Sequence, residues 1–308
     1  MLSFPRLGDY GYLGNAMFQY SALLGIADKH GYTPVYDYKK TGTMVTLHEH
    51  FNLSKAEEME HWKQVHGIKR MWKEPHYNFA EIVFETEGEE KNNIVREDTG
   101  ITRTNLKGAP LEDTKPILRI RDNTGLNGYF QSEKYFKHIE DDIRSEFKFS
   151  EEIEKDCESK IQQIKDKFKP DEVNVVGVHI RLGDYKMLEH IYVPLIKTSY
   201  YQDALSHMEN ELKTKIVFLI FSDEPEVCKQ FFQGGSCIFA EGGSPSQDMC
   251  LMSKCDHNVI ANSSFSWWGA WLNDKENKKV IAPKNWFIPN EKDQKDTKDL
   301  YCDDWILL

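Results

Sequence analysis

The sequence predicts an α/β fold whose C-terminal half is a parallel sheet covered by helices. Two observations support this class. From residue 173 onward, short runs rich in β-branched and aromatic residues alternate with helical segments, the pattern of successive strand–helix–strand units. Polar residues also directly follow three of these strands, and a parallel sheet brings such residues to one edge.

The N-terminal part is predicted to form a loop, a helix and a strand. Apolar residues recur at helical spacing over residues 17–30, Gly31 is expected to end that helix, and residues 33–38 fit the next strand. The loop before the helix is punctuated by three glycines, Gly8, Gly11 and Gly14.

The middle of the chain is less regular. Residues 44–110 are rich in His, Trp, Lys and Glu, and we interpret them as helices and loops of the first domain. Residues 137–170 are charged and helical in pattern. Because the composition changes there, we place a boundary near residue 168, which gives two domains, 1–168 and 169–308.

The second domain is predicted to hold alternating strands and helices. The expected strands are 173–180, 215–221, 237–240, 258–261 and 279–282. The expected helices between them are 199–213, 224–232, 247–254 and 266–272.

Composition excludes several classes of protein. The net charge is −11 and no basic stripe is present, so a nucleic-acid partner is not expected. No window holds the ~18 apolar residues of a membrane span, so no stable membrane insertion is expected. The six cysteines show no CxxC pair and no zinc spacing, so free thiols in a reducing compartment are expected, and their even number leaves disulfides as the alternative.

The end of the first strand carries the most informative polar group, His179, Arg181 and Asp184. Side chains alternate along a strand, so His179 and Arg181 are expected on the same side. A guanidinium fork beside a hydrogen-bonding ring suits a phosphate-bearing ligand. The other interpretation is a surface Arg181 paired with Asp184 and a satisfied histidine.

Two further polar groups fall at the same predicted edge. Ser222 and Asp223 follow the second strand, where Asp223 can accept hydrogen bonds from a base or ribose or can cap the next helix. Ser263, Ser264 and Ser266 lie where a helix begins, and hydroxyls and backbone N–H groups there form an anion site. Ordinary N-capping is expected to explain one of these serines. The chain lacks the Asp-x-Asp triplet with which many transferases hold a diphosphate through a metal, which favours metal-free binding.

Five segments of the chain form an ordered set of motifs: GYLGNAMFQY at 11–20, GYFQSEKYF at 128–136, HIRLGDY at 179–185, ANSSFSWWGAWL at 261–272 and APKNWF at 282–287. Together these segments resemble glycosyltransferase family 11, the α-1,2-fucosyltransferases. Two residues depart from the pattern of that family: Ala16 stands where a glutamine is usual, and Leu182 stands where a second arginine is usual.

The resemblance implies a two-domain glycosyltransferase B-type architecture with a Rossmann-like C-terminal donor-binding domain. In this architecture the C-terminal tail can pack back on the N-terminal domain. It implies a metal-independent, inverting transfer of L-fucose from GDP-β-L-fucose to the 2-hydroxyl of a galactose in an acceptor glycan, with no cofactor. The chain starts almost directly at its first motif, which favours a cytoplasmic enzyme. Two alternatives stay open: a related transferase of other linkage or donor, and an inactive nucleotide-sugar- or glycan-binding protein.

The resemblance also implies roles for single residues. Arg181 is expected to neutralise the β-phosphate, and Asp184 is the candidate general base, unless it only orients Arg181. The remaining expected donor contacts are Gly14 and Asn15 to the pyrophosphate, Ser264, Phe265 and Ser266 on its other side, His179 and Asp223 to guanine or ribose, and Asp248 to the nucleotide.

Overall fold

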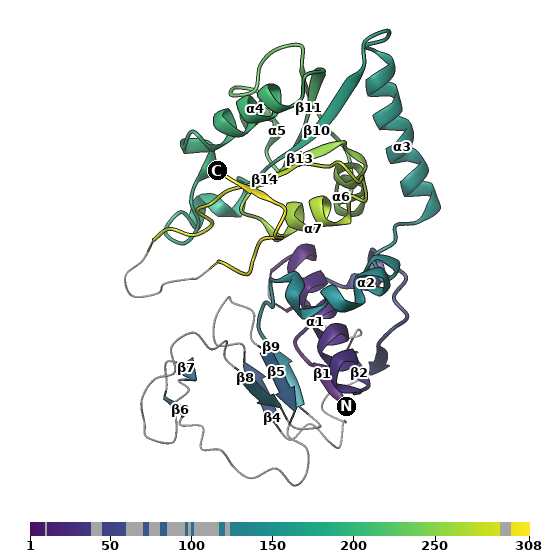
Figure 1. Ribbon diagram of the computed structural model, residues 1–308, viewed down its shortest axis with the longest axis vertical. Coiled ribbons are helices and arrows are strands. Elements are labelled where there is room, and N and C mark those ends of the chain that lie inside the picture. The colour runs from purple at the N-terminus through teal and green to yellow at the C-terminus, as the bar shows by residue number, and fades with distance from the viewer. Residues whose placement is uncertain are drawn as a thin grey trace. The chain divides into compact units, whose positions relative to one another are not determined.

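The computed structural model describes residues 1–9, 11–37, 45–59, 70–73, 81–84, 96–97, 100–101, 117–120, 124–289 and 297–308. The chain divides into two compact units (Figure 1). The first unit is Met1–Phe147 with Asp296–Leu300, and the second is Lys148–Lys295 with Tyr301–Leu308.

The division falls before helix α3 (Glu151–Asp166), whereas the sequence placed the boundary after it, near residue 168. The reason is packing: α3 lies against helix α6 (Pro245–Lys254) and strand β10 (Val173–Ile180), so it belongs to the core of the second unit. Because most residues of α3 are charged, the sequence does not show that the helix packs into this core. The short piece Asp296–Leu300 belongs to the first unit, where Asp299 pairs with Lys134.

The first unit contains a five-stranded parallel sheet in the order β3-β2-β1-β9-β4. Two smaller strand pairs accompany it, β5 (Glu81–Phe84) with β8 (Ile117–Ile120) and β6 (Arg96–Glu97) with β7 (Gly100–Ile101). The strands of the main sheet are β1 (Leu2–Phe4), β2 (Pro34–Asp37), β3 (Glu57–Met59), β4 (Arg70–Lys73) and β9 (Thr124–Asn127).

The prediction of helices and loops over residues 44–110 is therefore wrong for much of what the structure describes there. Apart from a 3-10 turn at Leu47–Glu49, the described elements of that range are strands. Each is only two to four residues long, so an alternating pattern has too few positions to become visible.

Helix α1 (Leu13–His30) packs on β1 and β2. It begins earlier than the sequence predicted, so Gly14 lies in its first turn and not in a loop. Gly31 ends the helix as expected, with a left-handed φ of 69° that glycine adopts without steric cost. Helix α2 (Glu140–Glu146) follows the aromatic segment later in this unit.

The second unit is built on a six-stranded, fully parallel sheet in the order β12-β11-β10-β13-β14-β15, with helices on both faces (Figure 1). This confirms the predicted α/β class, and the five predicted strands are all present. The sixth, β15, is only two residues long and was not predicted. Besides β10, the strands are β11 (Lys215–Ser222), β12 (Cys237–Phe239), β13 (His257–Val259), β14 (Val280–Ala282) and β15 (Ile306–Leu307), and the helices besides α3 and α6 are α4 (Tyr200–Glu211), α5 (Pro225–Cys228) and α7 (Ser264–Leu272).

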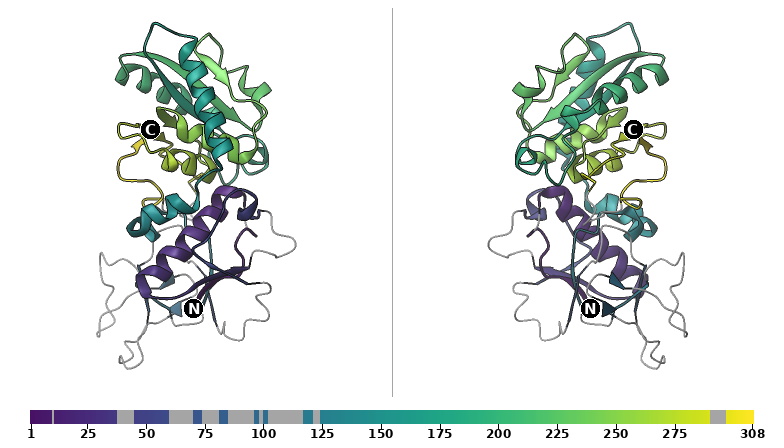
Figure 2. Two further views of the ribbon diagram at one scale, coloured as in Figure 1. Left: turned by 90° about the vertical axis from the view of Figure 1, so that its right-hand side faces the viewer. Right: turned by 90° about the vertical axis from the view of Figure 1, so that its left-hand side faces the viewer.

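The sheet that contains strand β10 has a layer of helices on each of its two faces. Val178 and Ile180 point into an apolar core with α4. His179 points to the other face, where its ring meets Phe265 of α7. Helices α3, α6 and α7 pack in succession on that second face (Figure 2). The alternation predicted for this strand is thus confirmed, and it carries the polar side chains away from the α4 core.

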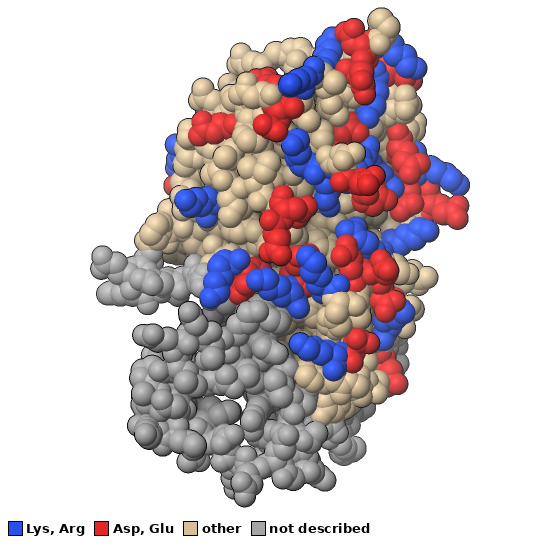
Figure 3. Space-filling view, in the orientation of Figure 1, with Lys and Arg blue, Asp and Glu red and all other residues tan. Residues whose placement is uncertain are grey.

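The surface of the second unit mixes charges of both signs. Helix α3 carries pairs one turn apart, such as Lys160 with Asp156 at 2.8 Å, and blue and red side chains are interspersed on the described part of the face in Figure 3. None of the helices in the described ranges is both long and apolar enough to cross a membrane. All six cysteines are free thiols.

Candidate functional site

The strand order of the second unit contains a switch point beside β10. The chain continues from β10 to β11 and β12 on one side, and then returns to place β13, β14 and β15 on the other. In open parallel sheets, ligands bind beyond the carboxyl ends of the strands where the order reverses. Here those ends carry Arg181, after β10, and Ser263, after β13.

Arg181 is held between two carboxylates. Its Nη2 donates to Asp184 Oδ1 at 2.6 Å, and its Nη1 lies 3.0 Å from Asp223 Oδ2. The three side chains are 22 to 29% exposed, so the cluster is partly desolvated and still open to a ligand. The structure therefore brings together three of the predicted site residues, and it places Asp223 beside Arg181.

A tyrosine lies beneath the guanidinium. The Cζ of Arg181 is 5.7 Å from the centre of the Tyr185 ring, which stacks in turn on Tyr192 at 4.3 Å. The Tyr185 hydroxyl donates to the carbonyl of Asn262 at 2.9 Å, and burial raises the pKa of that hydroxyl, so it stays a donor. This contact joins the loop after β10 to the loop after β13.

Sequence reasoning missed Asn262 as the centre of this junction. Its side-chain amide donates to the carbonyls of Val193 and Trp286, at 2.9 and 3.0 Å. The signal was available only as its position inside the ANSSFSWW segment, because its partners lie far away in the chain.

His179 is neutral and lacks a partner at one ring nitrogen. The side chain is only 5% exposed, and Nδ1 has no hydrogen-bond partner among the described residues. Burial, and then the positive charge of Arg181, lower its pKa to about 3. A neutral imidazole with an unused nitrogen can accept or donate one hydrogen bond, according to its tautomer, to a ligand at this edge.

The serines at the start of α7 have different environments. Ser263 is the N-cap and accepts from the N–H of Phe265 at 3.3 Å. Ser266 is fully buried; its hydroxyl donates to the Ser263 carbonyl and accepts from the Ala261 N–H. The structure therefore does not bring the Ser266 hydroxyl to the surface of the site. Ser264 and Phe265 are partly exposed at the helix start.

Ser222 and Asp248 are less directly tied to the cluster. The Ser222 hydroxyl accepts from the Glu224 N–H at 3.1 Å and from the Cys228 thiol at 3.2 Å, so it stabilises the turn that leads into α5, whose N-cap residue is Glu224. Asp248 lies in the first part of α6, and burial raises its pKa to about 6, against the effect of Lys160. Within the described ranges, no ion pair or hydrogen bond joins Asp248 to Arg181.

Leu182, where family 11-like sequences usually have a second arginine, points into the apolar core. It is 6% exposed and belongs to the cluster that contains Ile180 and Tyr201. Only its backbone N–H faces the site, where it donates to Asp223 Oδ1 at 2.9 Å.

The predicted pyrophosphate contacts Gly14 and Asn15 lie in the first unit. Gly14 is buried in α1, and Asn15 accepts from the amide of Gln131 at 2.8 Å. Gln19 strengthens the same region: it accepts from the Gly8 N–H and donates to the Gly128 carbonyl, both at 3.0 Å. The segments 11–20 and 128–136 thus form one connected structure. A donor contact by Gly14 or Asn15 stays a prediction.

The family model of glycosyl transferase family 11 matches residues 117–308, which is more than half of the chain. The chain belongs to glycosyl transferase family 11. Four of the five segments that suggested the resemblance lie inside this match, and the segment at 11–20 lies outside it.

Curated relatives in this family are similar over part of their length. An α-1,2-colitosyltransferase of Escherichia coli is 33% identical over 59% of this chain and 61% of its own. A galactoside α-(1,2)-fucosyltransferase 1 of Leontocebus fuscicollis is 26% identical over 53% of this chain and 50% of its own. The matches thus span between half and about three fifths of these relatives.

A solved structure supports the fold of this family 11 chain. The crystal structure of POFUT1 in its apo form has a TM-score of 0.50 and 12% sequence identity, over 91% of this chain and 97% of that one. The fold class is α/β of the glycosyltransferase B type, as the resemblance implied. Among the residues that the structure describes, no group of three or more His, Cys, Asp or Glu side chains is placed to hold a metal.

Proposed function

We propose that this chain is a glycosyltransferase that moves L-fucose from GDP-β-L-fucose to a sugar hydroxyl, the 2-hydroxyl of a galactose, with inversion and without a metal. The observation that carries the proposal is Arg181, a partly exposed guanidinium held by two carboxylates at the switch point of the sheet. Family membership supports the reaction class, and the names of the relatives support an α-1,2 linkage.

Arg181 is the proposed catalytic residue. When the bond between fucose and GDP breaks, negative charge develops on the β-phosphate oxygen. A pre-positioned guanidinium stabilises that charge more in the transition state than in the ground state, which lowers the barrier. An arginine does this without a metal because its fork matches two phosphate oxygens.

The start of α7 is proposed to hold the other side of the diphosphate. The N-terminal end of a helix attracts an anion, and Ser264 and Phe265 lie there at a partly exposed position. The Phe265 N–H already donates to the Ser263 hydroxyl, a bond that a phosphate oxygen would replace. The ring of His179 lies beside Phe265, and its buried, unpartnered Nδ1 is the proposed contact to a hydroxyl or carbonyl of the nucleoside.

Asp184 is the proposed general base. Its bond to Arg181 is made within the turn after β10, so a phosphate that takes over Nη2 would release the carboxylate. A released carboxylate beside the leaving group can accept the proton of the acceptor hydroxyl as that oxygen attacks the opposite face of the sugar.

A second candidate is the same reaction with colitose in place of fucose, because the E. coli relative carries that activity in its name. The test for both is release of GDP from GDP-fucose and from GDP-colitose, in EDTA, with a panel of β-galactosides. Acceptor-dependent release from one donor, with a 1,2 linkage in the product, supports the proposal for that donor. Binding without turnover on any acceptor contradicts it in favour of a binding protein.

A further inference from the structure

Asp223 is bonded to two parts of the loop that carries Arg181. One carboxylate oxygen accepts from the Leu182 backbone N–H at 2.9 Å, and the other pairs with Arg181 Nη1 at 3.0 Å. Asp223 comes from the end of β11, and the loop comes from the end of β10. The carboxylate therefore fastens both the backbone and the guanidinium of the loop to the neighbouring strand.

The residue that follows Arg181 and Leu182 is a glycine, Gly183, and the geometry explains why. A Cβ added to Gly183 would lie 2.5 Å from Asp223 Oδ2, closer than real Cβ atoms approach a neighbour. Any larger residue at this position must displace the carboxylate that pairs with Arg181. Gly183 thus makes room for Asp223.

The two carboxylates around Arg181 are anchored differently. Asp184 lies three residues from Arg181 in the same turn, and among the described residues its side chain bonds to Arg181 alone. Asp223 is also anchored by the backbone N–H of Leu182, in the loop that follows the neighbouring strand β10. When a phosphate competes for the guanidinium, we therefore expect it to replace the bond to Asp184, while the pair with Asp223 remains.

We infer that Asp223 is a positioning residue for Arg181, rather than a contact to guanine or ribose, and that Gly183 is required for that role. This inference rests on the proposed function, because it concerns the same reaction. It predicts that Asp223 affects transfer only through Arg181. A nucleotide contact would instead contribute independently of Arg181.

The test is a double-mutant cycle with Asp223→Asn and Arg181→Ala. Asparagine keeps the shape and one acceptor oxygen for Leu182 but cannot pair ionically with Arg181. GDP affinity by calorimetry and kcat/KM are measured for wild type, both single variants and the double variant. We expect Asp223→Asn alone to lower kcat/KM about 10- to 100-fold, as misplacement of a catalytic group does. In the Arg181→Ala background it should change neither GDP affinity nor rate by more than about twofold.

Effects that multiply in the double variant would overturn the inference and restore Asp223 as a nucleotide contact. Gly183→Ala places a methyl group against the Asp223 carboxylate and so disturbs its pair with Arg181. It should also lower kcat/KM, with little further loss when it is combined with Asp223→Asn. Glu224→Gln is the matched control, because this neighbouring carboxylate pairs with Lys186 and should leave the rate within twofold.

The two hypotheses fail differently. If wild type neither binds GDP nor transfers sugar, the proposed function is wrong. If wild type is active and the Asp223 and Arg181 effects are independent, only the positioning role is wrong. Thermal unfolding of each variant shows whether the fold is intact. If Asp223→Asn does not fold, the Gly183→Ala cycle with Arg181→Ala decides.

Discussion

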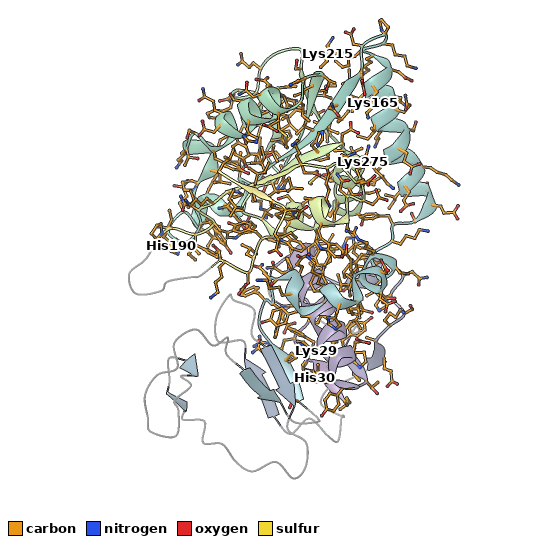
Figure 4. The ribbon with its side chains drawn as sticks, viewed as in Figure 1. Lys29, His30, Lys165, His190, Lys215 and Lys275 are labelled. Carbon is orange, nitrogen blue, oxygen red and sulfur yellow. The ribbon has the colours of Figure 1, made fainter. Side chains whose placement is uncertain are left out.

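The two ends of strand β10 carry ionic clusters of opposite composition. At its start, one carboxylate, Asp256, binds Lys165 at 2.7 Å, Lys275 at 2.6 Å and the Val175 N–H at 2.8 Å (Figure 4). At its end, one guanidinium, Arg181, lies between Asp184 and Asp223.

The difference shows how a structural cluster can be told from a binding cluster. Asp256 is 13% exposed, and cations and a backbone N–H surround it, so its bonds join α3, β10 and the segment after α7. At the other end, two carboxylates surround the single positive charge of Arg181. Such a cation can exchange one carboxylate for a phosphate without losing its anchor.

The largest effect is expected at Arg181. Arg181→Ala should lower the transfer rate at least ~100-fold, as loss of a transition-state charge partner does, with the unfolding temperature little changed. The matched control is Lys165→Ala at the other end of the strand, which should leave the rate per folded molecule unchanged. Near-normal transfer by Arg181→Ala would break the comparison.

Asp256 should behave in the reverse way. Asp256→Ala removes three charge-assisted hydrogen bonds and should lower the free energy of unfolding by about 2 kcal/mol, since the two lysines can still reach water. Its kcat/KM should stay unchanged. Urea unfolding measures the first and the GDP-release assay the second. Asp171→Ala, which breaks the exposed pair with Lys215, should cost little by comparison. Equal unfolding midpoints for Asp256→Ala and wild type would contradict this role.

The buried His179 makes the free energy of unfolding depend on pH, and the sign of this dependence is known. Its pKa is about 3 in the folded protein, because of burial and the charge of Arg181, against an ordinary value of 6.5. Below about pH 6.5 the unfolded chain binds a proton that the folded chain does not, so stability falls as the pH drops toward 3. Between pH 7 and pH 5.5 this one group should lower the free energy of unfolding by roughly 1 kcal/mol.

Urea unfolding of wild type and His179→Gln at about pH 7 and pH 5.5 isolates this contribution, because other groups titrate in both proteins. The difference between the two pH values should shrink in the variant by the amount given. An identical difference in both proteins would show that His179 is not buried in its neutral form.

The smallest effect separates the serines of α7. Ser266→Ala should lower the free energy of unfolding by about 1 kcal/mol, because it leaves the Ala261 N–H without its acceptor, and it should not change transfer. Ser264→Ala should change the GDP affinity more than the stability. The reverse pattern would mean that Ser266 reaches the ligand.

The sequence was most informative where elements are long and local. Strand β10 is eight residues of almost unbroken apolar character, and it was predicted to both of its ends. Helix α1 ends at a glycine whose backbone requires it, so its C-terminal end was predicted while its start was not. In the first unit β2 matches the predicted strand 33–38, but the other strands were missed because two to four residues carry no readable period.

The candidate site likewise has features that the sequence predicted and features that it did not. That Arg181, Asp184 and Asp223 share one edge follows from parallel strands, and it was predicted. That Asp223 holds Leu182, and that Ser266 faces inward to Ala261, depends on the register between strands and on helix rotation. No local pattern in the sequence records either. The same reason hid Asn262, whose partners lie 24 and 69 residues away.

The buried position of Leu182 limits what can replace it. An arginine here would place a charge among apolar side chains such as Ile180 and Tyr201, and the nearby Asp223 carboxylate already pairs with Arg181. Its cost would fall on folding before any benefit reached the ligand. A second arginine at this position therefore requires the surrounding core to change with it.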